Sequence, residues 1–187
     1  MTPFPLLQLP FVAMRHVLCM MTPFQLIDLS LTSSRGKSIV TNIGPRFKGY
    51  LDTSLAITLY ENGVWRYTMT SDESKDGKVT ISDTGIQESF KYSKDPIEKW
   101  KKLYKYLKEV LRCQFCKVTF DLSGPSFREI VDWLKCQQEV FESMSIKSKE
   151  ERDDDLKYVM EAFSNAVELD TLVHHHKETS KWRFRGT

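Results

Sequence analysis

Long apolar runs and cysteines are scarce in this chain of 187 residues. No segment approaches the ~18 uncharged apolar residues that a membrane-spanning helix needs. The nearest one, residues 4–21, is interrupted by Pro5, Pro10, Arg15 and His16, and no positive charge precedes it. We therefore expect neither a membrane anchor nor a secretory signal. Only 4 cysteines are present, too few for a disulfide-stapled secreted scaffold, so we expect a cytoplasmic or nuclear protein.

Short catalytic motifs are also missing. The sequence contains no G-x-G-x-x-G, no P-loop, no H-E-x-x-H and no G-x-S-x-G. Its 27 basic and 25 acidic residues leave a net charge of only +2, which gives no general reason to expect binding to nucleic acid or to an anionic membrane. We therefore expect a protein that is not an enzyme and that needs no cofactor.

One pattern resembles a zinc site. Cys113-x-x-Cys116 together with the histidines at 174–176 would supply two thiolates and two imidazoles. We expect Cys113 to end a helix, Cys116 to enter a strand and the histidines to follow a strand two positions away. Two interstrand spacings amount to ~10 Å, which is too far for shared ligands. We therefore predict no metal site.

Start signals predict three short helices in residues 1–45. Pro10 suits the first turn of a helix, Thr22-Pro23 with Gln25 forms a capping box, and Ser33 or Ser34 begins a third helix. Apolar residues are too numerous here for a module of this size to bury them all, since small domains bury only about 60 % of their surface. The surplus needs a partner, either the rest of the chain or another protein.

Residues 46–93 have strand character. The segments 54–60 and 64–70 flank Asn62-Gly63, a strong hairpin signal, and 78–83 and 87–93 are two more candidate strands. We expect a small antiparallel sheet of three or four strands.

Residues 94–176 repeat a helix-plus-strand unit about three times. Amphipathic helices begin at Asp95-Pro96, at Ser126 and at Asp153, and between them the pattern of Phe115, Val118 and Phe120 returns twice. This spacing is typical of leucine-rich repeats with parallel strands. Residues 177–187 are expected to be a tail. The fold class is therefore α+β: three helices, a small antiparallel segment, then short leucine-rich-repeat-like β/α units.

Alternation along the repeat strands divides their side chains between two faces. The predicted inward residues are Val118, Phe120, Met144, Ile146 and Leu172. The outward residues, which form the predicted substrate-binding face, are Thr119, Asp121, Ser145, Lys147, Thr171 and Val173. With only about three strands, the substrate surface is expected to be small. Because His174 occupies the last inward position, we expect the third repeat to be the loosest.

Residues 6–35 resemble an F-box. The resemblance rests on Leu9-Pro10, on the pair Val17-Leu18 and on the turn Ser33-Ser34-Arg35. This segment is especially similar to the F-box of nematode F-box proteins that carry a type 2 F-box-associated domain. That associated domain is in turn similar to the later segments FCKVTFDL, IVDWLKCQQ and LKYVMEAF. Gly36-Lys37 departs from the pattern, because many F-boxes place a Trp here. The implied domains are an F-box at 1–45 and an F-box-associated domain at 46–187.

This resemblance implies a substrate-recognition adaptor of an SCF-type (cullin-RING) ubiquitin ligase, which docks on a Skp-family adaptor and presents a repeat surface to an unknown protein substrate. The residues carried over as adaptor-binding are Leu9, Pro10, Val17, Leu18, Pro23, Leu26, Leu29 and Ser33. The alternative is a ligase-independent protein- or nucleic-acid-binding module that uses the basic helix 96–112.

Overall fold

The computed structural model describes residues 6–124, 126–137, 141–148, 152–163, 168–175 and 178–185, with the backbone alone in the last two ranges. After a short 3-10 turn at Leu6–Gln8, the chain forms α1 (Phe11–Met20), α2 (Pro23–Thr32) and α3 (Ser34–Ile43). The predicted caps are confirmed. Thr22 Oγ1 accepts from the Gln25 N–H at 3.3 Å, Gln25 Oε1 accepts from the Thr22 N–H at 2.9 Å, and Ser33 Oγ accepts from the Gly36 N–H at 3.0 Å.

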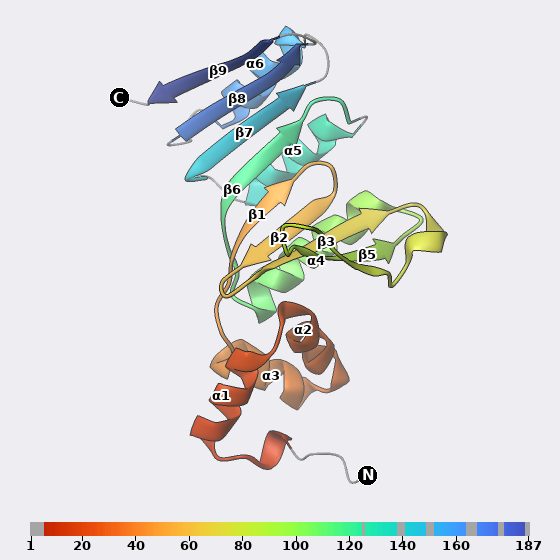
Figure 1. The fold of residues 1–187 in the computed structure, drawn as a ribbon, viewed down its shortest axis with the longest axis vertical. Helices are drawn as coiled ribbons and strands as arrows, with labels where there is room; N and C mark the ends of the chain where they lie inside the picture. The colour runs from red at the N-terminus through yellow and green to blue at the C-terminus, as the bar shows by residue number, and fades with distance from the viewer. Residues whose placement is uncertain are drawn as a thin grey trace.

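The nine described strands form a single sheet rather than two separate pieces (Figure 1). Its order is β4-β5-β3-β2-β1-β6-β7-β8-β9. The strands are β1 (Lys48–Asp52), β2 (Ala56–Tyr60), β3 (Val64–Thr70), β4 (Val79–Ile81), β5 (Gln87–Tyr92), β6 (Gln114–Asp121), β7 (Ser143–Ser148), β8 (Glu168–His175) and β9 (Glu178–Arg185). A 3-10 turn lies at Glu73–Lys75, and the remaining helices are α4 (Pro96–Val110), α5 (Phe127–Gln137) and α6 (Asp153–Ala162).

The β2–β3 hairpin around Asn62-Gly63 is confirmed, with Tyr60 opposite Val64. The expectation that the whole middle segment is antiparallel was wrong. β5 runs parallel to β3, because the long connection through β4 returns the chain to the same end of the sheet. The sequence reading also missed β1, which pairs antiparallel with β2 and parallel with β6 and so joins the middle segment to the repeats.

The strands of the three units are parallel, as predicted. β6 and β7 also have the predicted register, with Val118 opposite Met144 and Phe120 opposite Ile146. Whether the units are leucine-rich repeats remains a prediction. Helices α4, α5 and α6 lie on one face of the sheet (Figure 1).

The predicted register of the third strand was wrong. Met144 lies opposite Leu169, and Lys147 lies opposite Leu172, three residues away from the expected alignment. An odd shift exchanges the two faces of a strand, so Leu172 is in register with the outward Lys147, and Thr171 and Val173 are in register with Ile146 and Ser148.

β6 and β8 differ in how a three-residue spacing is used. The register of β6 against β1 shifts by one residue next to Cys116, so Phe115 and Val118 can both be buried although they are three residues apart. β8 pairs with β7 without such a shift. Leu169 and Leu172, which are also three residues apart, therefore fall at register positions that belong to opposite faces of the sheet. The expected tail was also wrong, because residues 178–185 form β9, antiparallel to β8.

One hydrophobic core extends from the sheet into the N-terminal helices. Trp100 of α4 is fully buried, and its Nε1–H donates to the carbonyl of Ala56 at 3.2 Å. Phe24 of α2 packs edge-on against Tyr67 of β3, with ring centroids 4.7 Å apart. The surplus apolar surface of the N-terminal module is therefore covered in part by the rest of the chain. In the part of the chain that the structure describes, no helix is long and apolar enough to cross a membrane.

Candidate functional site

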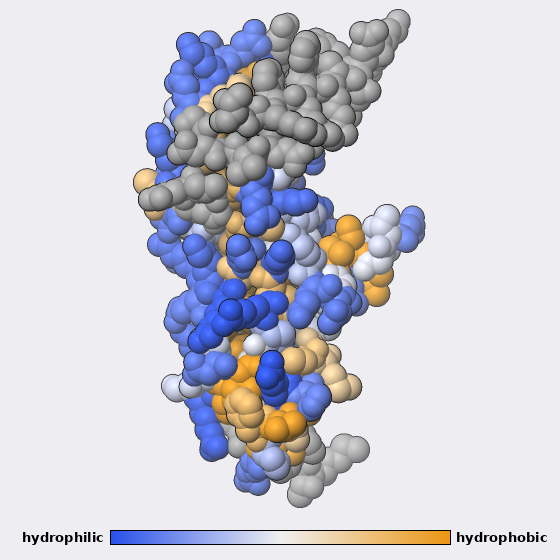
Figure 2. Space-filling model, turned by 90° about the vertical axis from the view of Figure 1, so that its left-hand side faces the viewer, coloured by the Kyte–Doolittle hydropathy of each residue, from blue (hydrophilic) through white to orange (hydrophobic). Residues whose placement is uncertain are grey.

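Helices α1 and α2 carry large apolar side chains that nothing in the described chain covers. Phe11, Val12 and Met20 of α1 are 60 %, 65 % and 84 % exposed, and Leu31 of α2 is 67 % exposed. Hydrophobic residues gather on this lower part of the molecule in Figure 2. We call these four residues the α1–α2 apolar surface. Exposed apolar residues gathered on one module mark an interaction site more often than an ordinary monomer surface.

The predicted adaptor-binding residues divide between core and surface. Pro23, Leu18 and Leu26 are buried, the last two completely, and they hold the three helices together. Leu9, Val17 and Leu29 are half-buried, whereas Pro10 and Ser33 are exposed.

Leu18 and Leu26 have no exposed area in the free chain, so they support the helical module from inside, and their role as docking anchors stays a prediction. The sequence reading missed Phe11, Val12, Met20 and Leu31 as surface residues. A helical projection of α1 contained part of the signal, since Met14 and Leu18 lie four residues apart on one face and Val12 does not share it. Phe11 is three residues before Met14 and shares that face, so its exposure could not be predicted in this way.

The sheet face opposite α4–α6 carries a shallow cavity of about 530 Å³. Its lining residues are Tyr50, Asp52, Tyr60, Val64, Arg66, Lys117, Val118, Thr119, Ser143, Ser145 and Lys147. Three of the predicted substrate-binding residues, Thr119, Ser145 and Lys147, are thus brought together here. Asp121 lies outside this lining, and its carboxylate accepts from the Ser123 N–H at 2.9 Å. The side chains of Thr171 and Val173 lie outside what the structure describes.

Hydrogen bonds hold the floor of this sheet-face cavity. Arg66 donates through Nε to Thr58 Oγ1 and through Nη2 to the Tyr50 hydroxyl, both at 3.2 Å. The Tyr60 hydroxyl and Cys116 Sγ are 2.9 Å apart. Burial first, and then this hydrogen bond, raise the pKa of Tyr60 well above its ordinary value, so the phenol is neutral and can donate. The sequence reading did not foresee Tyr50, Tyr60 or Arg66, because β1 and its neighbours were not expected in the same sheet as the repeats.

The charges on this face are mixed. Arg66, Lys117 and Lys147 line the cavity together with one carboxylate, Asp52. Glu88 lies opposite Arg66 on β5. Such a surface suits a polar peptide that carries both donors and acceptors, rather than a uniformly charged polymer.

Most cations of the basic helix α4 have partners within the chain. Lys101 contacts Glu98 at 3.0 Å and Glu129 of α5 at 2.7 Å, and these carboxylates raise the pKa of its ammonium group. Lys105 lies over the ring of Trp133, and Lys108 lies over the ring of Tyr104.

Both cysteines of the Cys113-x-x-Cys116 pair are buried, and the side chains of the histidines at 174–176 lie outside what the structure describes. Cys113 is buried, and burial raises the pKa of its thiol to about 12, which keeps it protonated. Across the described ranges, no three His, Cys, Asp or Glu side chains gather closely enough to hold a metal ion.

Comparison with known proteins gives one match. Residues 6–48 match the F-box domain family. No curated protein and no solved structure matches the chain. The matched range contains α1, α2 and α3 and ends at the first residue of β1. These helices therefore form an F-box domain, which indicates an adaptor role in an SCF-type ubiquitin ligase.

Proposed function

We propose that this chain is a non-catalytic substrate-recognition adaptor: its F-box docks on a Skp-family adaptor through the α1–α2 apolar surface, and the sheet-face cavity receives a protein substrate. The observation that carries the docking proposal is the exposure of Phe11, Val12, Met20 and Leu31 on a module that buries many of its other apolar residues in the core it shares with the sheet. Side chains of this size, once desolvated at the centre of an interface, provide most of its binding energy.

Capture of the full chain by a purified Skp-family adaptor tests the docking surface. We expect Met20→Asp and Val12→Asp to weaken capture at least about tenfold, because each places a charge in a desolvated contact. Both variants should unfold at the wild-type temperature, since the replaced side chains are exposed in the free protein.

Ile81→Asp is the matched control, because Ile81 is 70 % exposed on β4, outside the F-box domain. Its capture should equal that of the wild type. Wild-type capture of Met20→Asp, or an equal loss with Ile81→Asp, would contradict the docking proposal.

The substrate proposal has its own test. A photo-crosslinking residue at position 145, inside the sheet-face cavity, should trap a substrate. The amount of crosslinked product should rise when the proteasome is inhibited. The same residue at Lys135, which is exposed on α5, should not. Charge reversal by Lys147→Glu should lower the Ser145 crosslink. Equal yields from both positions would exclude this face as the substrate site.

The alternative, a ligase-independent module that binds a protein or a nucleic acid through the basic helix 96–112, is not favoured. Lys101, Lys105 and Lys108 of this helix each contact other residues of the chain.

A further inference from the structure

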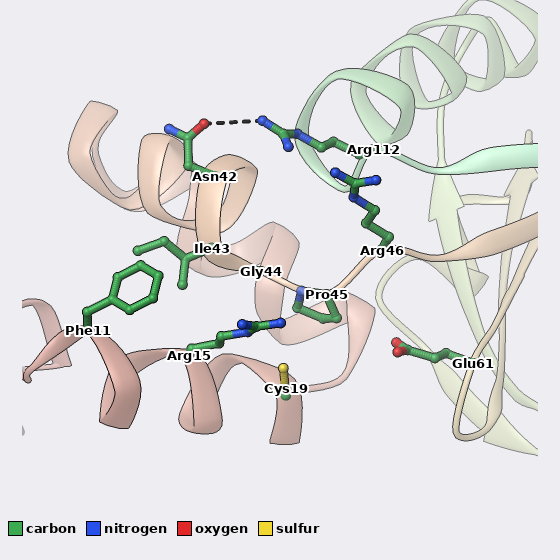
Figure 3. A pocket seen from close by; sticks show the side chains of 10 residues that line it. All are labelled: Phe11, Arg15, Cys19, Asn42, Ile43, Gly44, Pro45, Arg46, Glu61 and Arg112. Atoms are coloured by element: carbon green, nitrogen blue, oxygen red, sulfur yellow. Dashed lines mark hydrogen bonds between the residues drawn. The ribbon is translucent and has the colours of Figure 1, made fainter.

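A second cavity, of about 510 Å³, lies where the F-box domain meets the sheet (Figure 3). Four segments of the chain build it: α1, the end of α3 with the α3–β1 connection, the β2–β3 turn and the α4–β6 connection. The lining residues are Phe11, Arg15, Cys19, Asn42, Ile43, Gly44, Pro45, Arg46, Glu61 and Arg112. We call it the junction cavity.

The junction cavity has an excess of positive charge. Arg15, Arg46 and Arg112 line it with a single carboxylate, Glu61, and three cations less one anion leave a charge of +2. Lys37 of α3, by contrast, forms an ion pair with the carboxylate of Glu109 at 2.7 Å. Here Arg112 donates to Asn42 Oδ1 at 3.3 Å, which is a neutral acceptor. Figure 3 shows the guanidinium groups of Arg46 and Arg112 next to one another, with Glu61 set apart from them.

Local backbone conformation holds the two neighbouring arginines in place. A Cβ at Gly44 would lie 2.4 Å from the carbonyl oxygen of Val40, so only glycine allows the chain to turn this tightly at the end of α3 and lead directly to Arg46. Arg112 has a φ of 48°, in the left-handed region that follows many helices and that glycine occupies at least cost. The chain thus keeps an arginine side chain at a position where the backbone favours glycine, and local strain of this kind is concentrated at functional sites.

The opposite end of the junction cavity is apolar. Phe11, which is 60 % exposed, and the half-buried Ile43 lie together on the side away from Arg46 and Arg112 (Figure 3). A ligand that fits both ends carries a compact anion and an apolar body.

We propose that the junction cavity binds a small organic phosphate monoester, with its phosphate on the neighbouring guanidinium groups of Arg46 and Arg112 and its organic part against Phe11 and Ile43, while Arg15 adds positive charge to the lining. Planar guanidinium groups present paired N–H donors that match two oxygens of a phosphate. A phosphate monoester above its second pKa, near 6, carries about two negative charges and so neutralises the charge excess. Because the cavity joins α1 and α3 to the β2–β3 turn and to α4, the bound ligand would connect the F-box domain to the sheet.

Titration calorimetry on the full chain tests this site, with phenyl phosphate and inorganic phosphate as probes at pH 7.5 and constant ionic strength. We expect one saturable site that binds phenyl phosphate several-fold more tightly than inorganic phosphate. Arg46→Gln should weaken both probes at least about tenfold, because one guanidinium of the phosphate clamp is lost. Phe11→Ala should remove the preference for phenyl phosphate and leave inorganic phosphate unchanged.

Two further variants separate binding from folding. Arg112→Gly relieves the left-handed backbone, so it should fold at least as stably as the wild type and still lose phosphate binding. Glu61→Gln removes the one lining carboxylate and should tighten binding several-fold. Arg66→Gln, on the sheet face, is the control and should bind both probes as the wild type does.

Absence of saturable binding would overturn the proposal. So would equal binding by Arg46→Gln and Arg66→Gln, or weaker binding by Glu61→Gln. Arg46 and Arg112 lie outside the α1–α2 apolar surface, so capture of the same two variants by a Skp-family adaptor should remain normal. This comparison distinguishes failure of the junction site from failure of the adaptor proposal.

Discussion

At the scale of single residues, Cys113 is the clearest case of an ionisable group placed in the core. Burial raises its pKa from 9.0 to about 12. Between these values the unfolded chain releases the thiol proton while the folded chain retains it, so stability is fully present below about pH 9 and is lost as the pH rises. Tyr104, whose pKa burial raises to about 12, acts in the same direction.

We therefore predict a loss of stability on the alkaline side. At pH 10 the contribution of Cys113 to the free energy of unfolding should be about 1 kcal/mol lower than at neutral pH. Urea denaturation at pH 8 and pH 10 measures this difference. Cys113→Ala should lose about 1 kcal/mol less than the wild type between the two pH values. An identical loss in both proteins would show that Cys113 is not a group responsible for it.

Gly44 is a second residue whose identity matters, because the backbone around it leaves no room for a Cβ atom. Gly44→Ala should lower the free energy of unfolding by about 1–3 kcal/mol, because the added methyl group meets backbone rather than a movable side chain. Gly124→Ala is the matched control. A Cβ there would lie 3.6 Å from the carbonyl oxygen of Asp121, an ordinary contact, so its stability should change by less than about 0.5 kcal/mol. Similar denaturation midpoints for the two variants would contradict this account.

At the scale of the elements, α2 depends on its capping box. Thr22 and Gln25 satisfy each other's backbone N–H groups at the start of the helix that carries Phe24 and Leu26. Thr22→Ala should therefore destabilise the chain by about 1 kcal/mol, measured by chemical denaturation. Ser34→Ala changes an exposed hydroxyl in the first turn of α3, whose N-cap is Ser33, and should have almost no effect. An equal effect of both substitutions would mean that the cap contributes nothing.

At the scale of the whole molecule, the F-box domain and the sheet share one core. Besides the Phe24–Tyr67 contact, the Ser30 hydroxyl and the Tyr106 hydroxyl are 2.7 Å apart, which joins α2 to α4. All four tryptophans of the chain lie outside residues 6–48, so their fluorescence reports on the rest of the molecule.

This shared core predicts that a change in the F-box domain destabilises the sheet. Phe24→Ala should lower the unfolding midpoint observed by tryptophan fluorescence, by an amount that corresponds to about 2 kcal/mol, because it leaves a cavity beside Tyr67. Phe11→Ala, which removes an exposed ring, should leave the midpoint unchanged. If the fluorescence midpoint of Phe24→Ala equals that of the wild type, the two parts unfold independently.

The sequence by itself determined the local features of this protein. The caps at Thr22, Ser33 and Asp95 and the hairpin at Asn62-Gly63 depend on hydrogen bonds and dihedral preferences within four residues, and all are observed. The F-box is likewise recognisable from a short continuous segment.

Only the tertiary structure decided what is buried and what meets across the fold. Phe11 and Leu18 are apolar residues on the same face of α1, yet the first is 60 % exposed and the second is fully buried, because burial depends on what packs against each part of that face. β8 pairs with β7 three residues away from the alignment that the repeated residue pattern predicts, because the pairing of strands is decided between neighbours in space. Arg15, Arg46 and Arg112 meet at one cavity although they are distant in the sequence, since the fold of the whole chain brings their segments together.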